Sequence, residues 1–564
     1  MRTPPPGIRN ELRWTAGHSG ELKVLLDLTL FSSTSKNEDV NQKDLKPSRP
    51  GAISSQSQIF NDSVHGHIKM DSVLLEIIDT PEFQRLRNIK QLGGGYYVFQ
   101  GASHNRFEHS IGVAHLAGQL VQSLMENQED LGITYKDKLC IQIAALCHDL
   151  GHGPFSHLFE DFMKRTSKVV LLSNHEKQSI IMFDHLIAKK KEKLQEKMKS
   201  IGNGKEFTQE DFQFIKDLIS GSKPNPWPYK ERSEEKLFLF DILANKTTGI
   251  DVDKMDYFSR DCLHLGMKNN FSHERFVMFA RVCKNEKGIN QICMRDKEAL
   301  NMYEIFHVRY LLYNNACHHR VTEAIQTMIV DALLAADNHF ELEKSLKISE
   351  AVKDPEVYLR FTDNILQDIM RSSNPKLEPA KKIIERIETR DLYKFVGGDK
   401  FDPEIIESFN TDEEWKKIVK NWLQDLSWPE DLQKVDIKDI RVKRAKLNYG
   451  MDKDPIEKLL FYRKNNKDKA VKLEKKEISH LLPERFAEMK VMMFYTGPNQ
   501  EILTTLKDNL DKFWMRVNLC RIGAARTLLH ELRAEPGVAV TMRATVHAHR
   551  TCSRLPAIIG HASL

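Results

Sequence analysis

The strongest chemical signal in this sequence is the stretch Cys147-His148-Asp149-Leu150-Gly151-His152-Gly153-Pro154-Phe155-Ser156-His157. It follows the segment from Lys136 to Cys147, whose apolar residues recur every three to four positions and predict an α-helix. Glycines come next and end that helix. His148 and Asp149 therefore lie at a helix terminus, where the relaxed last turn lets two adjacent side chains converge on one ion. An imidazole and a carboxylate form a mixed nitrogen and oxygen ligand set, which suits Zn, Fe or Mn better than Ca.

A metal site of this kind needs two more ligands. His109, upstream in the segment Ser103 to Ser110, and Asp253, downstream in the segment Gly249 to Tyr257, supply suitable side chains. Two His and two Asp leave coordination positions open for water and a substrate oxygen, and a water held there could lose a proton near neutral pH. An isolated His-Asp pair is more often a surface or capping pair. The accumulation of nearby histidines favours the metal site instead.

Composition excludes several broad classes of protein. The chain has 564 residues, of which 41% are hydrophobic and 29% charged, and its formal net charge is +5. These values exclude a wholly disordered chain and a polytopic membrane protein, and the mild charge gives no general argument for nucleic acid. The cysteines form no CxxC pair, and neither a signal peptide nor an apolar run of roughly 20 residues is recognisable. We therefore expect a soluble intracellular protein in a reducing compartment, with no membrane partner.

Changes in composition and hydrophobic pattern along the sequence divide the chain into four parts. Residues 1–56 are rich in Pro, Ser and Asp, and we expect them to be poorly ordered. A dense helical pattern covers residues 57–395. Residues 396–515 are expected to form a smaller lobe, in which Ile440 to Glu477 is basic and strand-like. The tail, residues 516–564, contains neither lysine nor aspartate, and we expect no folded role for it.

The chain also resembles a known enzyme family from about Ile59 to about Leu510. The motifs that carry the resemblance are Phe60-Asn61-Asp62, Ile77-Ile78-Asp79-Thr80-Pro81, the segment Lys90 to Phe99, and the segments around His109, His148 and Asp253. They resemble the HD-domain metal phosphohydrolases and, within these, the SAM-and-HD-domain deoxynucleoside triphosphate triphosphohydrolases. The resemblance implies a mainly α fold, with a helical HD-domain core and a smaller α+β C-terminal lobe. The SAM domain that precedes the core in the family is not recognisable here.

The resemblance implies cleavage of a dNTP to a deoxynucleoside and inorganic triphosphate. It assigns metal ligation to His109, His148, Asp149 and Asp253, with Mg accompanying the bound nucleotides. Water activated at the metal attacks the α-phosphorus, and His175 resembles the general-acid candidate, assisted by His157. Glu160 stands where the family has an Asp. The expected catalytic residues are His175, His157, His152 and Arg106, and the expected substrate contacts are Gln91, Leu92, Arg106, His152, His157, Lys254, Tyr257, Asp261, Arg309 and Tyr313.

The residues themselves agree with a triphosphate substrate. Arg106 and Lys254 bring cations close to two of the candidate metal ligands, and Asp253, Tyr257 and Asp261 recur at the spacing of one helix face. The segment Met302 to Asp337 contains no Gly or Pro and predicts one long helix, along which Arg309, Tyr313, Cys317 and Arg320 form a second row. Tyr313 and Cys317 stand where the family has His and Tyr beside the base or sugar.

The resemblance further implies a regulatory site that binds GTP or a dNTP. Binding there assembles an active homotetramer from monomers or dimers in the family, lowers cellular dNTP pools and restricts viral reverse transcription. Nuclear location is a family inference, with the cytoplasm as the alternative. Gln58 replaces a phosphate-binding Lys of the family, and Arg320 replaces another Lys. The expected regulatory residues are Asn61, Asp79, Gln84, Arg87, Val98, Arg275, Arg295, Lys297, Asn301, His319 and Arg320.

Three alternative functions remain open at this point. One is a different HD hydrolase, such as a phosphodiesterase or nuclease, although the cations Arg106, Lys254 and Arg309 favour a triphosphate. Another is a single-stranded nucleic-acid-binding protein that uses the basic segment 441–472 and its aromatic neighbours. The last is a catalytically impaired HD-domain regulator.

Overall fold

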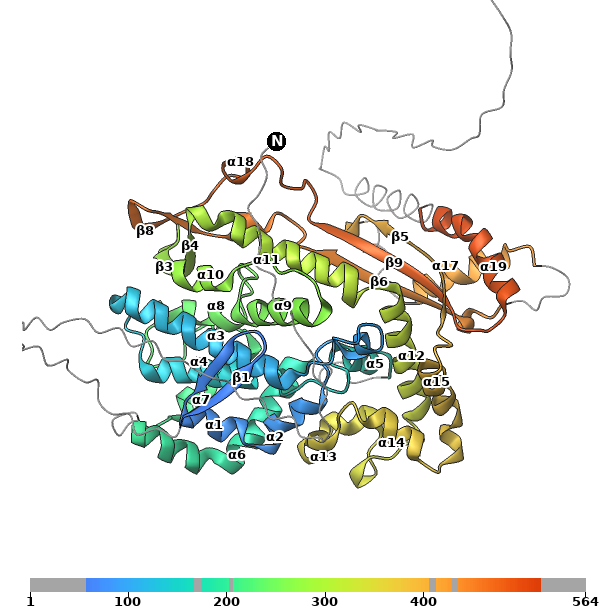
Figure 1. Cartoon of the computed structure of the whole chain (residues 1–564), viewed down its shortest axis with the longest axis horizontal. Coiled ribbons are helices and arrows are strands. Elements are labelled where there is room, and N and C mark those ends of the chain that lie inside the picture. Colours follow the sequence, from blue (N-terminus) through green and yellow to red (C-terminus); the bar gives the residue numbers. More distant parts are fainter. Residues whose placement is uncertain (1–56, 167–173, 202–205, 405–411, 429–434, 519–564) are drawn as a thin grey trace, which may run out of the picture. The chain divides into compact units, whose positions relative to one another are not determined.

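A computed structural model describes residues 57–166, 174–201, 206–404, 412–428 and 435–518 (Figure 1). The fold of these residues is mainly α-helical, as predicted, with short strands near its beginning and a β-rich part toward its end. The expectations for residues 1–56 and for the tail from residue 519 onward fall outside the described residues. None of the helices in the described part of the chain is both long enough and apolar enough to cross a membrane.

The helices that carry the candidate site pack against one another. Helix α3 (Arg106–Asn127) contacts both α4 (Tyr135–Cys147) and α9 (Val252–Leu265). Reciprocal capping boxes fix the first turns: Asn105 with Glu108 begins α3, and Thr134 with Asp137 begins α4. Apolar side chains of all three helices belong to one buried core, so their polar ends are held rigidly.

The other helices and the first hairpin surround this group. Thr80 caps α2 and Pro81 occupies its first turn, an arrangement that these residue types favour. The remaining elements of this part are β1 (Gln58–Asp62), β2 (Gly66–Met70), α1 (Ser72–Ile78), α2 (Pro81–Gln84), α5 (His157–Thr166), α6 (His175–Ile201), α7 (Gln209–Ser220), α8 (Phe240–Leu243), α10 (His273–Phe279), α13 (Pro355–Arg360), α14 (Ile365–Arg371) and α15 (Glu378–Glu388).

The prediction of one long helix from Met302 to Asp337 is wrong. The segment contains α11 (Ala299–Leu312), a π-helical turn over Tyr313–Cys317 and α12 (Arg320–Ala336). His319 has an extended backbone, with ψ of 138°, and its side chain accepts a hydrogen bond from the N–H of Val321. It therefore acts as the N-cap that starts a new helix. Arg309 and Arg320 consequently do not share one helix face.

The C-terminal lobe is α+β, as predicted. Its antiparallel sheet has the order β5–β9–β6, formed by β5 (Lys394–Phe401), β6 (Ile440–Asn448) and β9 (Ala487–Tyr495). Helices α17 (Asp412–Gln424) and α19 (Gln500–Asp508) contribute to a second, separate apolar core. Strand β6 contacts α11 and β5 contacts α12 (Figure 1). The lobe thus lies directly against the helices that precede it, and the boundary at residue 396 stays a prediction.

The rest of the strand-like basic segment joins a different sheet. Strands β7 (Phe461–Arg463) and β8 (Asn466–Val471) close a small barrel with β3 (Arg281–Lys284) and β4 (Asn290–Arg295). A short helix, α18 (Lys475–Ile478), follows. Two hairpins that lie far apart in the sequence therefore form this barrel.

Candidate active site

The structure brings the four predicted metal ligands together. His109 lies in the first turns of α3, His148 directly follows α4, and Asp253 lies in the first turn of α9. Nε2 of His109 is 3.1 Å from Oδ1 of Asp253 and 3.5 Å from Oδ2 of Asp149, and Nε2 of His148 is 3.4 Å from both carboxylates. Ligands with bonds of about 2.0–2.2 Å to one cation lie roughly 3 Å apart, so these spacings fit a shared ion.

The tautomers of the two histidines point to the same conclusion. Nδ1 of His109 donates to Asp256 Oδ2 at 2.7 Å, and Nδ1 of His148 donates to the carbonyl of Ala145 at 2.7 Å. The proton of each neutral ring is thereby placed on Nδ1. Both Nε2 atoms are buried and make no hydrogen bond. A buried imidazole lone pair without a donor is costly, and a metal ion between these atoms and the carboxylates removes that cost.

The charged side chains around this position also favour the binding of a cation. Burial lowers the pKa of His109, but the carboxylates of Asp253 and Asp256 beside the ring outweigh this effect and raise the pKa to about 10. Burial likewise acts against ionisation of Asp149, yet Arg106 and His148 hold its pKa well below the usual range. The carboxylates therefore stay charged. A divalent cation can balance this negative charge, and in its absence protons on the histidines balance it.

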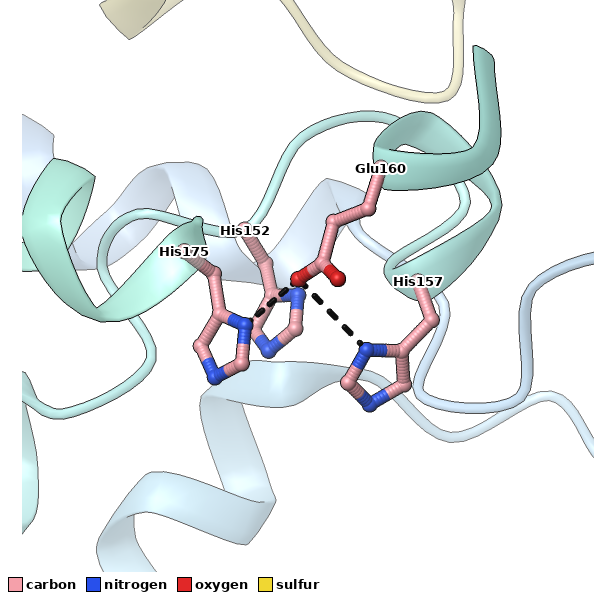
Figure 2. Close-up of side chains that lie close together, drawn as sticks. All are labelled: His152, His157, Glu160 and His175. Carbon is pink, nitrogen blue, oxygen red and sulfur yellow. Dashed lines mark hydrogen bonds and ion pairs between the residues drawn. The ribbon is translucent and has the colours of Figure 1, made fainter. Parts of the chain in front are cut away.

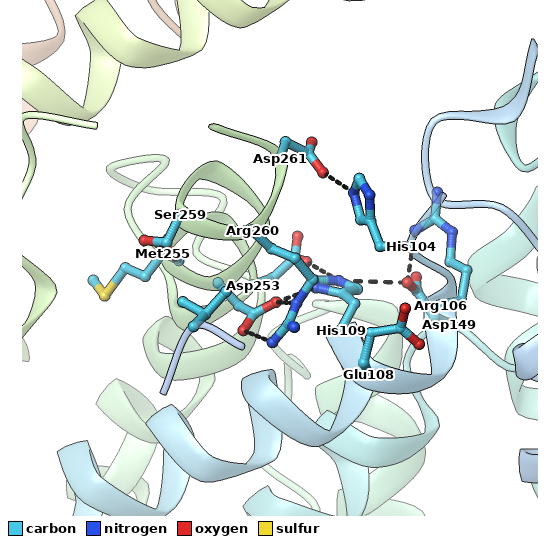
Figure 3. Close-up of polar contacts among 12 residues, drawn as sticks. His104, Arg106, Glu108, His109, Asp149, Asp253, Met255, Ser259, Arg260 and Asp261 are labelled. Carbon is cyan, nitrogen blue, oxygen red and sulfur yellow. Dashed lines mark hydrogen bonds and ion pairs between the residues drawn. The ribbon is translucent and has the colours of Figure 1, made fainter. Parts of the chain in front are cut away.

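Arg106 supports the cluster from one side. Its guanidinium donates to Asp149 Oδ2 at 2.6 Å and to Ser156 Oγ at 3.0 Å (Figure 3). The side chain is buried, so it links a candidate ligand to the loop that leads into α5. In this arrangement Arg106 orients Asp149, while its predicted contact with a phosphate stays a prediction.

A second group of titratable side chains adjoins the first. Figure 2 shows His152, His157 and His175 gathered around the carboxylate of Glu160. Oε1 of Glu160 is 2.5 Å from Nδ1 of His175 and 3.6 Å from Nδ1 of His157. Nε2 of His152 is 3.3 Å from Oδ1 of Asp149, which joins the two groups. Burial opposes ionisation of Glu160, but hydrogen bonds from His157 and His175 hold its pKa below the usual range.

The second group is better suited to proton transfer than to a metal ion, although its donor atoms lie within 4.8 Å of one another. The rings of His152 and His175 are stacked, with centroids 4.1 Å apart and planes only 15° apart. An imidazole lone pair lies in the plane of its ring, so two stacked rings cannot both aim at one ion between them. The carboxylate of Glu160 instead lies on Nδ1 of His175, which orients the ring and leaves Nε2 to exchange a proton with a substrate, as a general acid must.

Backbone geometry explains why the loop contains glycine beside the histidines. A Cβ on Gly151 would lie 2.2 Å from the carbonyl oxygen of His175 and 2.2 Å from the N–H nitrogen of Ser179. Only glycine lets the start of α6 approach the His148 turn so closely. Further along the loop, Phe155 and Ser156 have φ values of 58° and 60°. Such strain in residues other than glycine is typical of functional loops that their surroundings hold in place.

Two cavities flank this pair of groups. The first, of about 410 Å³, is lined by His148 and Asp253 of the metal cluster, by His175, and by three lysines, Lys246, Lys254 and Lys458. The second, of about 400 Å³, is lined by His157 and contains more apolar surface. Among its other lining residues are Gln91, Leu92, Tyr313, Cys317 and His318, together with Lys443 and Arg444 from β6. Gln91 is buried and its Oε1 has no hydrogen-bond partner, so it is available to a ligand.

The remaining predicted substrate residues already have partners within the chain. Arg309 donates to the carbonyl and the side chain of Asn448 on β6, and its guanidinium lies 4.1 Å from the ring of Tyr313. Asp261 accepts a hydrogen bond from His104 at 2.6 Å (Figure 3). Tyr257 follows Asp253 by one helical turn, and its ring centroid is 6.3 Å from that of His109. Lys254 is held by Asp251 at 2.7 Å.

Sequence reasoning gave no role to two residues that the structure places at the site. His104 forms a hydrogen bond with Asp261, and Asp256 accepts one from Nδ1 of His109, the ring nitrogen that faces away from the metal cluster. The only signal for Asp256 was its position one helical turn after Asp253 on the same helix. His65, in the turn between β1 and β2, also contacts Asp256, at 2.7 Å.

Three of the predicted regulatory residues, Asp79, Gln84 and Arg87, lie at the end of α1 and around α2. Arg87 donates to Gln84 Oε1 at 2.8 Å, and its guanidinium stacks over the ring of Phe107 at 3.5 Å. Asp79 is exposed at the C-cap of α1. The three side chains are close along the chain, and their role in binding an effector stays a prediction.

The other predicted regulatory residues fall into separate patches. Arg275, Arg295 and Lys297 surround the ring of Phe279, with cations 5.3, 5.8 and 4.1 Å from its centroid. Elsewhere, His319 lies 6.0 Å from the ring of Phe99. The other four residues lie elsewhere or contact other parts of the chain. Asn61 lies on β1, the N–H of Val98 donates to the carbonyl of Gly95, the side chain of Asn301 donates to the carbonyl of Ser272, and Arg320 lies over the ring of Phe395.

The basic segment 441–472 gives little support to the nucleic-acid alternative. Arg441 pairs with Asp331 at 3.0 Å and Lys443 with Asp161 at 3.2 Å, so part of the positive charge is compensated. Phe461 is 0% exposed and Tyr462 is 7% exposed. These two rings are therefore not available as stacking platforms for bases.

Comparisons with known proteins agree with this geometry. The model of the HD domain matches residues 106–261, which include all four candidate ligands. The deoxynucleoside triphosphate triphosphohydrolase SAMHD1 of Bos taurus is 43% identical over 83% of this chain and 79% of its own length. The protein of the same name from Homo sapiens is 45% identical over 78% of this chain and 70% of its own length, and the Dictyostelium discoideum homologue is 39% identical over 78% and 77%. The chain therefore belongs to the SAMHD1 family of deoxynucleoside triphosphate triphosphohydrolases.

Proposed function

We propose that this chain cleaves dNTPs to deoxynucleosides and inorganic triphosphate at a divalent metal held by His109, His148, Asp149 and Asp253. The observation that carries the proposal is the pair of buried, unbonded Nε2 atoms of His109 and His148, which face the two carboxylates beside a lysine-lined cavity. The names of the relatives support the same reaction. Zn, Fe or Mn suits this ligand set, and the metal when bound lowers the pKa of a water and polarises a phosphate oxygen.

The two cavities divide the binding of the substrate. Lys246, Lys254 and Lys458 make the first cavity suitable for the triphosphate, together with its Mg. Gln91, with its unsatisfied oxygen, and Leu92 make the second cavity suitable for the deoxyribose. Tyr313, Tyr257, Asp261 and Arg309 complete the proposed contacts around sugar, base and phosphate.

The proton for the leaving group comes from the second group of side chains. Glu160 contacts Nδ1 of His175, which orients the ring and leaves its Nε2 to donate the proton. His157 and His152 assist, because one lies near Glu160 and the other connects the group to Asp149. Arg106 holds Asp149 in place during the reaction.

The regulatory proposal concerns GTP and dNTP effectors. We propose that Asp79, Gln84 and Arg87 read guanine, and that Arg275, Arg295, Lys297 and Asn301 contact a second nucleotide from one subunit while Asn61, Val98, His319 and Arg320 contact it from others. Effector binding then favours a homotetramer. Its cellular roles would be to lower dNTP pools in the nucleus or cytoplasm and thereby to restrict reverse transcription.

The experiment that tests this function measures inorganic triphosphate released from dGTP by the purified chain with Mg²⁺, with and without GTP. Asp253→Ala and His148→Ala should abolish release, while His67→Ala, an exposed histidine on β2, should leave it unchanged. Release that persists in both active-site variants would contradict the proposed metal site. Because dGTP itself carries guanine, the regulatory proposal is tested with dCTP as substrate: release from dCTP that does not depend on GTP would contradict the regulatory proposal alone.

A further inference from the structure

A buried carboxylate that the proposed reaction does not use lies behind the metal cluster. Asp256 is 0% exposed, and each of its oxygens receives two hydrogen bonds. Oδ2 accepts from His109 Nδ1 at 2.7 Å and from Arg260 Nε at 2.9 Å. Oδ1 accepts from His65 Nε2 at 2.7 Å and from the Arg260 guanidinium at 2.9 Å. A carboxylate bound at four positions has no freedom to rotate.

The contact with His109 has a direct consequence for the metal. A charged acceptor on Nδ1 holds the proton there, leaves the lone pair on Nε2 and increases the electron density that Nε2 offers to a cation. We propose that Asp256 is a positioning residue that fixes the tautomer and the ring orientation of His109, and thereby sets the affinity of the site for its metal. This inference rests on the proposed function, because it presupposes a metal at His109.

The neighbours of Asp256 keep it ionised and immobile. Arg260 is itself fully buried and pairs with Asp256 through two nitrogens, and it also pairs with Asp62 at 3.0 Å. His65, which follows Asp62 in the turn between β1 and β2, donates the remaining hydrogen bond. The first hairpin of the described chain is thus connected to the metal cluster through one carboxylate.

A glycine in the middle of α3 makes this arrangement sterically feasible. A Cβ on Gly112 would lie 1.9 Å from Asp256 Oδ1 and 2.6 Å from the guanidinium of Arg260. Glycine is unfavourable within a helix, so its presence one turn after His109 requires a packing reason. The close approach of Asp256 to α3 is that reason. Gly112→Ala should therefore displace the carboxylate from His109 without removing its charge.

The test measures metal affinity rather than activity alone. Purified full-length protein is stripped of metal and titrated with Zn²⁺, and separately with Mn²⁺, in competition with a chromophoric chelator. We expect Asp256→Asn and Gly112→Ala to weaken binding by about 10- to 100-fold. Two matched controls should stay within about threefold of wild type. Asp211→Asn removes another fully buried carboxylate bonded to an arginine, and Gly118→Ala changes another buried glycine of α3.

The outcomes separate the inference from the proposed function. Affinities of Asp256→Asn and Gly112→Ala equal to those of the controls would overturn the role of Asp256. If Asp256→Asn does not fold, Gly112→Ala decides, because it keeps every side chain of the cluster. Tight metal binding by the wild type without triphosphate release from any dNTP would overturn the proposed function, while the affinities of the variants would still decide about Asp256.

Discussion

Glu160 holds His175 more closely than it holds His157: its Oε1 lies 2.5 Å from Nδ1 of the first and 3.6 Å from Nδ1 of the second. Glu160 stands where the resembling family has the shorter Asp. In this chain the carboxylate lies on the histidine that begins α6. The side chain that depends most on Glu160 is therefore His175.

Glu160→Gln should lower kcat for dGTP about 10- to 100-fold, because an amide is a weaker acceptor for Nδ1 of His175 and holds this ring less well in place. The value of kcat comes from the rate of triphosphate release at saturating dGTP. Glu192→Gln, an exposed change on α6, serves as the control. A kcat equal to that of the control would argue against a role of Glu160 in proton donation.

Gly151→Ala should move His175 and its group away from the metal cluster around His148. The added Cβ meets backbone atoms of His175 and Ser179 at 2.2 Å, so α6 must move away from the His148 turn. We expect kcat to fall at least about 10-fold, since small displacements of catalytic groups have large effects on rate. Ser179→Ala removes the hydrogen bond from the N–H of Gly151 without steric conflict and should have a smaller effect in the same direction. Equal activity of Gly151→Ala and wild type would show that the close approach is dispensable.

Asp363 should make stability depend on pH. It accepts hydrogen bonds from the N–H groups of Lys90 and Phe155, and burial outweighs these and raises its pKa to about 6, from 3.8. The folded state therefore binds the proton more tightly than the unfolded state. Its contribution is fully present below pH 3.8 and is lost as the pH rises through 6, a change of about 3 kcal/mol in the free energy of unfolding.

Denaturant unfolding of wild type and Asp363→Asn between pH 4 and 7 measures this contribution. The amide does not titrate, so the difference in free energy of unfolding between the two proteins should change in favour of the variant as the pH rises. A difference that is constant across this range would mean that Asp363 titrates alike in the folded and unfolded chains.

Cys317→Tyr should strengthen substrate binding. Cys317 lines the second cavity at a position where the resembling family has Tyr, and an aromatic face stacked on a base contributes about 1–3 kcal/mol. We expect KM for purine dNTPs to fall about 10-fold, with a smaller fall for pyrimidines. Cys317→Ser, which changes polarity but not size, is the matched control. The prediction fails if KM rises for every dNTP, which would mean that the tyrosine fills the cavity without stacking.

The sequence predicted the elements whose signals are local. The apolar periodicity before His148 and the cap at Thr80 depend on neighbouring residues, and both helices lie where these signals placed them. The meeting of His109, His148 and Asp253 followed from the resemblance, since no spacing rule brings three distant helix ends together. Its geometric basis is the packing of α3 on α4 and α9.

Other features depend on contacts that no local pattern contains. Nothing between Met302 and Asp337 breaks a helix by propensity, yet the chain turns at His319. Tyr313, Ala316 and Cys317 of the π-helical turn line the second cavity, and such turns occur often at functional sites. Asp256 was similarly hidden, because its role depends on Gly112 and on His65 from the first hairpin.

Strand β6 and the loop that follows it contribute walls to both cavities. Gly450, Met451 and Lys458 line the cavity beside the metal cluster, and Lys443 and Arg444 line the neighbouring cavity. A form of the chain that lacks residues 440–460 would therefore keep every candidate metal ligand and still lose walls of both cavities. In such a shortened form the metal site would remain without complete substrate sites, although a comparison of HD motifs alone would classify it as an intact enzyme.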